Sequence, residues 1–479
     1  MNFWDSNVWS FILIASILLL SMILAHVLKK NIPFLNRSLI PASVLGGVII
    51  LIFATIYKAI TKEPFFNLNI FSIVDVDGEK VVKGNDVLET ITYHCLAIGF
   101  IAMGFRNTKK ENNKKRTREI FDTGITTVST YLIQALIGII ITIIFTPKIT
   151  GLIEASGILL ALGYGQGTGQ ALNYGRMYEN TYGFIGGANF GLAIAALGFL
   201  SASFGGVIYL NILKKKGKLK QLHYSENEEL TIGKIQGKDE IPVNNSIDKL
   251  TIQLALVVGV YALSYLIMKG LGNIVGEGLR ATIYGFNFLI GTLVAVVIKL
   301  LFKFLKKHRI MKKEYINNFM MNRIGGVAFD IMIVAGIAAI DLEYIKDYWV
   351  LLIVMGFIGA ISTFIYIHFV SKVLFKEYQY EQFFAMYGML TGTASTGIIL
   401  LREIDPNFDT PASDNLVYQN LPAIIFGLPI MFLASYAPHN RQSAIISACI
   451  VFGLLLFLLI LLFRNQIFKK KKNNSKNDL

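Results

Sequence analysis

Cysteine and charged residues are both scarce in this chain of 479 residues. Only two cysteines occur, Cys95 and Cys449, and both lie in apolar segments, so they cannot form a disulfide framework or a metal cluster. Charged residues make up 16% of the chain, whereas soluble domains carry about 25%. Hydrophobic residues make up 54%. These proportions exclude a soluble globular protein and indicate a polytopic membrane protein.

Acidic residues are the scarcer of the two charged classes. The chain has 31 Asp and Glu against 45 Lys and Arg, which gives a net charge of +14. Such an excess can indicate nucleic-acid binding, but here the basic residues lie in loops between apolar runs. Enrichment of Lys and Arg in cytoplasmic loops explains them, and we expect no nucleic-acid partner.

Common catalytic patterns are also missing. The sequence has no HExxH pattern, no Ser–His pair in an apolar run and no Gly-rich loop that ends in Lys-Ser/Thr. The Asp75-Val-Asp77-Gly78 sequence lacks the other ligands of a calcium loop, and we interpret it as an exposed hairpin turn. We therefore expect neither an enzyme nor a bound cofactor, apart from a coupling ion.

Apolar runs long enough to cross a membrane occur throughout the chain, because a crossing helix needs about 20 such residues. The first run is followed by Lys29 and Lys30 and has no basic segment before it, which argues against a cleaved signal peptide. We expect about eleven spans by this criterion, at residues 8–28, 39–60, 88–105, 123–145, 183–213, 250–269, 281–304, 325–340, 348–369, 417–437 and 443–463.

Loop charges predict the orientation. Three segments are rich in Lys and Arg and should be cytoplasmic: residues 106–118, 214–220 and 303–313. Two loops, 61–86 and 341–347, carry most of their charge as Asp and Glu and should face outward. These assignments alternate correctly with the spans if the N-terminus is outside and the tail from Lys469 to Lys472 is inside.

Two nearly uncharged segments rich in Gly and Thr lie between apolar runs: Gly163-Tyr-Gly-Gln-Gly-Thr-Gly169 and Thr391-Gly-Thr-Ala-Ser-Thr-Gly397. Non-helical backbone at membrane depth is tolerated only where protein buries it or it lines a wet cavity. Each arm of about 12 residues rises roughly 18 Å, short of a bilayer core of about 30 Å. We therefore predict re-entrant hairpins at 151–175 and 380–402, which enter and leave on one side.

The predicted fold is an all-α polytopic membrane protein with two inverted repeats, each of five spans and one hairpin. The first repeat covers residues 1–213, a cytoplasmic linker 214–248, the second repeat 249–437, and an additional helix with a basic tail 438–479. An odd number of spans inverts the second copy, so the hairpins should open from opposite faces. Their tips would meet near the midplane, as alternating access requires.

At these residues the chain resembles the glutamate:sodium symporter (ESS) family of bacterial transporters. Ile40-Pro41-Ala-Ser-Val-Leu-Gly46-Gly47 is similar to a family motif in the second span, and both hairpins lie where the family has its own. Gln166 stands where family members have histidine, and Leu390, Thr391 and Ser395 replace glycine, leucine and proline. The resemblance implies a homodimer in the bacterial inner membrane, with sodium and a small carboxylate as partners.

Residues near both tips are candidates to bind the substrate and the ion. A carboxylate needs an arginine or free N–H groups at a helix start, which predicts substrate binding by Gln166, Gly167, Thr168, Gly169, Asn173, Arg176, Gly392, Thr393 and Arg402. Sodium needs several oxygen ligands, which predicts ion binding by Gly165, Asn189, Asp330, Thr391, Ser395 and Thr396.

Each candidate also has a structural interpretation. Small residues let helices pack closely, and Asn189 can hydrogen-bond between helices. Arg176 can pair with Glu179, and Arg402 with Glu403 or with lipid headgroups as a cytoplasmic anchor. An acid inside a span is a functional candidate, but Asp330 can instead lie at the interface near Arg323.

The predicted function is sodium-coupled symport that imports a small organic anion, with glutamate as the first choice, by alternating access. A carrier or exchanger for another carboxylate, or a proton-coupled symporter, would use the same hairpins. A membrane-embedded enzyme and a passive channel are the alternatives from other classes.

Overall fold

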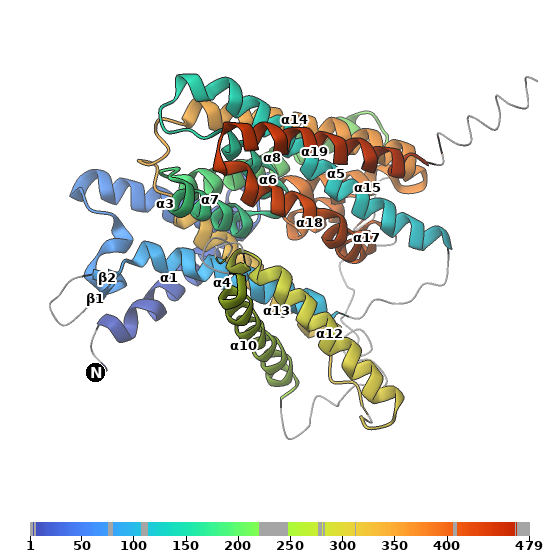
Figure 1. Ribbon diagram of the computed structural model, residues 1–479, viewed down its shortest axis with the longest axis horizontal. Helices are drawn as coiled ribbons and strands as arrows, with labels where there is room; N and C mark the ends of the chain where they lie inside the picture. The colour runs from blue at the N-terminus through green and yellow to red at the C-terminus, as the bar shows by residue number, and fades with distance from the viewer. Residues whose placement is uncertain are drawn as a thin grey trace, which may run out of the picture. The chain divides into compact units, whose positions relative to one another are not determined.

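The computed structural model describes residues 3, 6–74, 80–106, 114–219, 248–275, 280, 283–311, 313–405, 410–464 and 466. Nearly all of them lie in helices (Figure 1). The predicted Asp75–Gly78 turn, most of the 214–248 linker and the Lys469–Lys472 tail lie outside the described residues. Two short antiparallel strands, β1 (Ile73–Val74) and β2 (Lys80–Val82), flank that turn.

The expected spans are present. Within the described ranges, 11 helices are long and apolar enough to cross a membrane, which confirms the prediction of an all-α polytopic membrane protein. They are α1 (Ser6–Asn31), α3 (Ala42–Thr61), α4 (Gly84–Phe105), α5 (Lys114–Phe145), α8 (Gly187–Lys215), α10 (Lys249–Val275), α12 (Asn287–Lys307), α13 (Asn318–Ala338), α14 (Trp349–Leu374), α18 (Asn420–Tyr436) and α19 (Arg441–Leu462).

Some helix ends differ from the predicted ones because hydropathy marks only the apolar part of a helix. α5 begins at Lys114 rather than at residue 123, since its first turns carry charged side chains. α13 begins at Asn318 rather than at residue 325, because the Asn317 side chain accepts a hydrogen bond from the Met320 amide at 2.7 Å and caps the helix.

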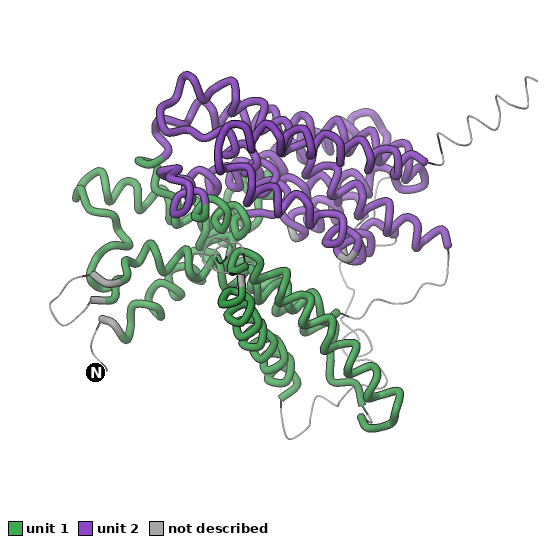
Figure 2. Tube along the Cα trace, in the orientation of Figure 1, with its two compact units in different colours: residues 1–109, 168–177, 221–344 green, residues 110–167, 178–220, 345–479 purple. Residues whose placement is uncertain are grey.

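The chain divides into two compact units, coloured separately in Figure 2. Unit 1 comprises Met1–Lys109, Thr168–Met177 and Gln221–Tyr344, and unit 2 comprises Lys110–Gly167, Tyr178–Lys220 and Ile345–Leu479. Each unit therefore takes segments from both predicted repeats. The division into two inverted repeats stays a prediction.

In unit 1, α4 packs against α13 and α12, and α3 packs against α13 and α1. Lys58 of α3 forms ion pairs of 2.7 Å with both Asp341 and Glu343, so the last turn of α3 lies beside the loop that follows α13. Toward the other ends of the helices, the Lys299 ammonium donates to the Gly104 carbonyl at 2.7 Å. Each of these contacts lies near loops that are predicted to face the same side, and the orientation itself stays a prediction.

In unit 2, α5 is a central helix in contact with α14, α18, α19 and the short helices of the first polar segment. Its buried hydroxyl side chains donate to carbonyls of its own preceding turn: Thr126 to Asp122 at 2.7 Å, and Thr130 to Thr126 at 2.7 Å. Such bonds satisfy the hydroxyl groups within the helix. α5 can therefore carry a polar stripe inside an apolar bundle.

Candidate ion and substrate site

Both polar segments are pairs of short helices with a break between them. In the first, α6 (Leu159–Gln166) ends at Gly167, whose φ of 79° and ψ of −170° suit only glycine, and α7 (Thr168–Tyr182) follows. In the second, α15 (Gln379–Thr391) and α16 (Ala394–Arg402) are separated by Gly392 and Thr393. The breaks lie at the predicted glycine-rich sequences.

The first segment begins and ends at one corner of unit 2. At its start, Glu154 lies 3.8 Å from Arg441, at the beginning of α19. At its end, the Tyr182 hydroxyl donates to the Ser435 carbonyl at 2.9 Å, at the end of α18. Only the four residues 437–440 join those two helices, so the chain enters the segment and leaves it at the same corner.

The second segment begins and ends near the start of α5. The Tyr378 hydroxyl, just before α15, donates to Glu119 at 2.9 Å. After α16, the Pro411 carbonyl accepts from Arg116 at 3.0 Å. The first segment instead meets α5 near its end, where Thr142 donates to the Glu154 carbonyl. Glu119 and Thr142 are 23 residues apart, about 35 Å along a helix, so the two segments approach α5 from opposite ends.

The inner ends of α6 and α15 converge at Gln134, in the interior of α5. Its amide nitrogen donates to the Thr363 hydroxyl and to the Leu390 carbonyl, both at 2.9 Å. A Cβ placed on Gly165 would lie 3.3 Å from the Gln134 amide oxygen. Gln134 is 0% exposed. One buried amide of α5 thus lies beside the last turns of both short helices.

Helix ends of this polarity suit a cation. The last carbonyls of a helix lack N–H partners, and the helix dipole places partial negative charge there. The C-terminal ends of α6 and α15 are the ends that meet at Gln134. The described residues contain no group of three or more His, Cys, Asp or Glu side chains that could hold a metal ion. The oxygens at this point, those of the Gln134 amide and of the last carbonyls of α6 and α15, are neutral and match the chemistry of sodium.

The predicted residues of the second tip partly satisfy one another. The Thr391 hydroxyl donates to the Tyr387 carbonyl at 2.7 Å within its own helix. Thr393 and Thr396 place their hydroxyl oxygens 3.5 Å apart, and a Cβ on Gly392 would lie 2.9 Å from the Thr396 hydroxyl. The side chain of Ser395 lies outside the described residues.

The predicted residues of the first tip belong to both units. In unit 2, the Gln166 amide nitrogen is buried and has no hydrogen-bond partner among the described residues, and Asn189 is buried near the start of α8. In unit 1, Thr168 donates to the Met332 carbonyl at 3.3 Å, and Asn173 donates to the Gly285 carbonyl at 2.5 Å. A Cβ on Gly169 would contact Leu96 and Met332 at 2.8 Å.

Arg176 and Arg402 each lie nine residues past the break in their own segment. Arg176 pairs with Glu89, and its Nε donates to the Glu89 carboxylate at 2.9 Å. Glu179, the alternative partner considered for Arg176, accepts from the Ala188 amide at 3.3 Å. Arg402 is exposed at the last residue of α16. Asp330 lies twelve residues after the start of α13, well past the first turns, because that helix begins earlier than predicted.

Sequence reasoning missed two buried amides. Besides Gln134, the Gln170 side chain in the first turn of α7 is 0% exposed. Neither its amide nitrogen nor its oxygen has a hydrogen-bond partner among the described residues. A usable signal existed for Gln134, which is the only amide side chain in the predicted span 123–145. Gln170 directly follows the glycine-rich sequence that drew attention to its neighbours.

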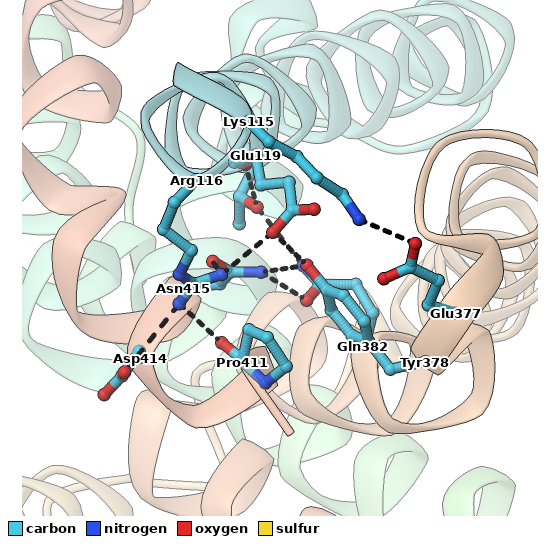
Figure 3. Close-up of polar contacts among 10 residues, drawn as sticks. Lys115, Arg116, Glu119, Glu377, Tyr378, Gln382, Pro411, Asp414 and Asn415 are labelled. Atoms are coloured by element: carbon cyan, nitrogen blue, oxygen red, sulfur yellow. Dashed lines mark hydrogen bonds and ion pairs between the residues drawn. The ribbon is translucent and has the colours of Figure 1, made fainter. Parts of the chain in front are cut away.

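A buried polar cluster fixes the base of the second segment to α5 (Figure 3). Arg116 donates to Glu119 at 3.1 Å and to Asn415 at 2.7 Å, and Asn415 donates to Gln382 at 2.9 Å. Burial raises the pKa of the Tyr378 phenol above its ordinary value. This phenol therefore stays protonated and able to donate to Glu119.

Comparison with known proteins agrees with this arrangement. The model of the sodium/glutamate symporter family matches residues 89–408, about two thirds of the chain. The matched region contains Gln134 and both broken segments. A search of curated proteins gave no match. The chain is a member of the sodium/glutamate symporter family.

Proposed function

We propose that this protein is a secondary active symporter that imports glutamate, or a closely related small organic anion, with sodium by alternating access. The observation that carries the proposal is the meeting of α6 and α15 at Gln134 after approaches from opposite ends of α5. A site reached from two opposite directions can open to one side at a time. This geometry is the one that alternating access needs.

The C-terminal and N-terminal helix ends in these segments suit different ligands. The carbonyl ends of α6 and α15 favour sodium, whereas the N–H groups at the start of α7 favour a carboxylate. Gly167 lies between the two kinds of end along the chain, since it ends α6 and precedes α7. Gln166 adds a buried amide nitrogen that can donate to the substrate. The residues proposed to bind the ion and those proposed to bind the substrate are therefore neighbours in the sequence on either side of Gly167.

The orientation and assembly of the protein are also proposals. The start of α5 carries Lys114, Lys115, Arg116 and Arg118, and the end of α8 carries Lys214 and Lys215, which favours a cytoplasmic location for both. The N-terminus is then outside and the C-terminus inside the bacterial cytoplasmic membrane. The family resemblance adds a homodimer as the working assembly. Transport without chemical change of the substrate needs no catalytic residue, so no enzymatic activity is proposed.

Uptake into proteoliposomes tests the proposal. Purified protein is reconstituted, and accumulation of radiolabelled glutamate is measured with an inward gradient of sodium, potassium or protons imposed separately. We expect accumulation above the equilibrium level with sodium only. Accumulation with protons only would contradict sodium coupling, and uptake that equilibrates without any gradient would indicate a passive channel. Accumulation of another carboxylate, but not of glutamate, would change the substrate assignment.

A further inference from the structure

The orientation of the Gln134 amide is fixed by its neighbours. The Leu390 carbonyl can only accept a hydrogen bond, so the group 2.9 Å from it must be the amide nitrogen. The amide oxygen therefore points elsewhere, and a Cβ on Gly165 would lie 3.3 Å from it. This oxygen is buried and has no hydrogen-bond partner among the described residues. An unsatisfied buried acceptor is unfavourable and calls for a ligand.

The surroundings of this oxygen indicate which ligand it takes. It lies at the meeting of two helix C-terminal ends, those of α6 and α15, where the last carbonyl oxygens have no N–H partner in the continuing helix. A Cβ on Gly198 would contact the Thr391 carbonyl, so α8 also lies against the end of α15. A cluster of acceptors at negative dipole ends attracts a cation and repels an anion. Neutral amide and carbonyl oxygens are hard donors of the kind that bind alkali and alkaline-earth ions.

We infer that the Gln134 amide oxygen is a sodium ligand and that it acts together with terminal carbonyls of α6 and α15. This inference rests on the proposed function, in which sodium is the coupling ion. Gln134 would serve two purposes at once, because its nitrogen holds α15 through Leu390 while its oxygen binds the ion. Occupancy of the site would then bind α6 and α15 to the same point of α5.

The charge of the site has a consequence for coupling. The donors named here are all neutral, so only dipoles oppose the charge of the bound sodium. An anionic substrate bound nearby would supply the missing negative charge, and each ligand would then raise the affinity for the other. We therefore expect the sodium concentration for half-saturation to fall when substrate is present.

Two variants test the inference, with two readouts each. Gln134→Met removes the amide at similar volume, and Gln134→Asn keeps an amide but withdraws its oxygen by one methylene. The first readout is the melting temperature of the purified protein in detergent as sodium replaces choline, since an ion that binds the folded state raises it. The second is the sodium dependence of glutamate uptake. We expect half-saturating sodium to rise about tenfold or more in both variants, the change that loss of about 1.4 kcal/mol of binding produces.

Gln253→Met is the matched control. Gln253 is also a buried amide of a long helix, but both of its groups are satisfied: the nitrogen donates to the Tyr315 carbonyl at 2.7 Å, and the oxygen accepts from the Asn317 amide at 3.0 Å. Its replacement should lower the melting temperature and leave half-saturating sodium unchanged. A single symmetrical peak in size-exclusion chromatography shows which variants are folded.

The outcomes separate this inference from the proposed function. If sodium stabilises the wild-type protein and half-saturating sodium is unchanged in a folded Gln134 variant, the inference is wrong and the function stands. If sodium neither stabilises the wild-type protein nor drives its uptake, the proposed coupling has failed, and with it the inference. Because Gln134→Asn is the milder change, its half-saturating sodium concentration can still be measured if Gln134→Met does not fold.

Discussion

Replacement of Arg116 by Met should loosen the second segment at its base. The Arg116 side chain is 8% exposed and holds Glu119, Asn415 and the Pro411 carbonyl. Loss of one partner of a buried ion pair costs about 3–5 kcal/mol, because the other charge is left uncompensated. Glu119 keeps its bond from Tyr378, so we expect the low end of that range, about 3 kcal/mol. This corresponds to roughly a hundredfold lower ratio of folded to unfolded protein.

The assay is the temperature at which half of the detergent-purified protein is lost from the size-exclusion peak, measured together with glutamate uptake. Lys115→Met is the matched control in the next position of α5, because its ion pair with Glu377 is exposed, at 59% and 72% of the two side chains. Screened surface pairs contribute little, so this variant should match the wild type.

A double variant checks the physical reason. If an uncompensated charge on Glu119 causes the loss, Arg116→Met combined with Glu119→Gln should recover much of the stability, since both charges are then removed. Equal stability of Arg116→Met and Lys115→Met would refute the reasoning. A double variant that is no better than Arg116→Met would show that lost packing, rather than charge, dominates.

Three further predictions follow from single positions. Gly388→Ala places a Cβ 2.7 Å from the Gly397 Cα, so overpacking should destabilise the folded protein by about 1–3 kcal/mol and slow glutamate uptake. Gly427→Ala is the control, because its Cβ meets Val128 only at 3.8 Å, and it should change neither stability nor uptake. Equal uptake by both variants would contradict the close packing of α15 on α16. Gln170→Leu should raise the melting temperature, because an unsatisfied buried amide costs about 1–3 kcal/mol, and should abolish uptake if this amide serves the substrate; unimpaired uptake would remove it from the site. Arg176→Gln should reduce the amount of folded protein by removing the Arg176–Glu89 ion pair, and adding Glu89→Gln should restore part of it; a double variant that is no more stable would show that Arg176 stabilises through other contacts.

Features set by local composition could be predicted from the sequence. Apolar runs locate helices because each run must be buried in lipid or protein whatever its partners are. The breaks at Gly167 and Gly392 could be predicted for the same reason, since glycine and threonine in an apolar region disfavour a continuous lipid-facing helix. The early start of α13 could not, because one cap at Asn317 decides it.

Features set by contacts distant in sequence could not be predicted. Gln134 reaches Leu390 across 256 residues, and no local pattern encodes that contact. Arg176 illustrates the same limit, since it forms an ion pair with Glu89, 87 residues away. The candidate list therefore favoured residues beside the glycines and omitted the amide on the helix between them. The membership of each unit could not be predicted either, because each unit combines segments from both halves of the sequence.

The interleaving of the two units bears on how the protein is made. Gln134 leaves the ribosome 229 residues before Thr363, an interval of roughly 10–50 s at ordinary rates of synthesis. During that time the Gln134 amide nitrogen has neither of its native acceptors, the Thr363 hydroxyl and the Leu390 carbonyl. α5 is then synthesised, but its partners α14 and α15 are not. During synthesis, the polar face of α5 must therefore contact the insertion machinery or earlier helices until α14 and α15 have been made.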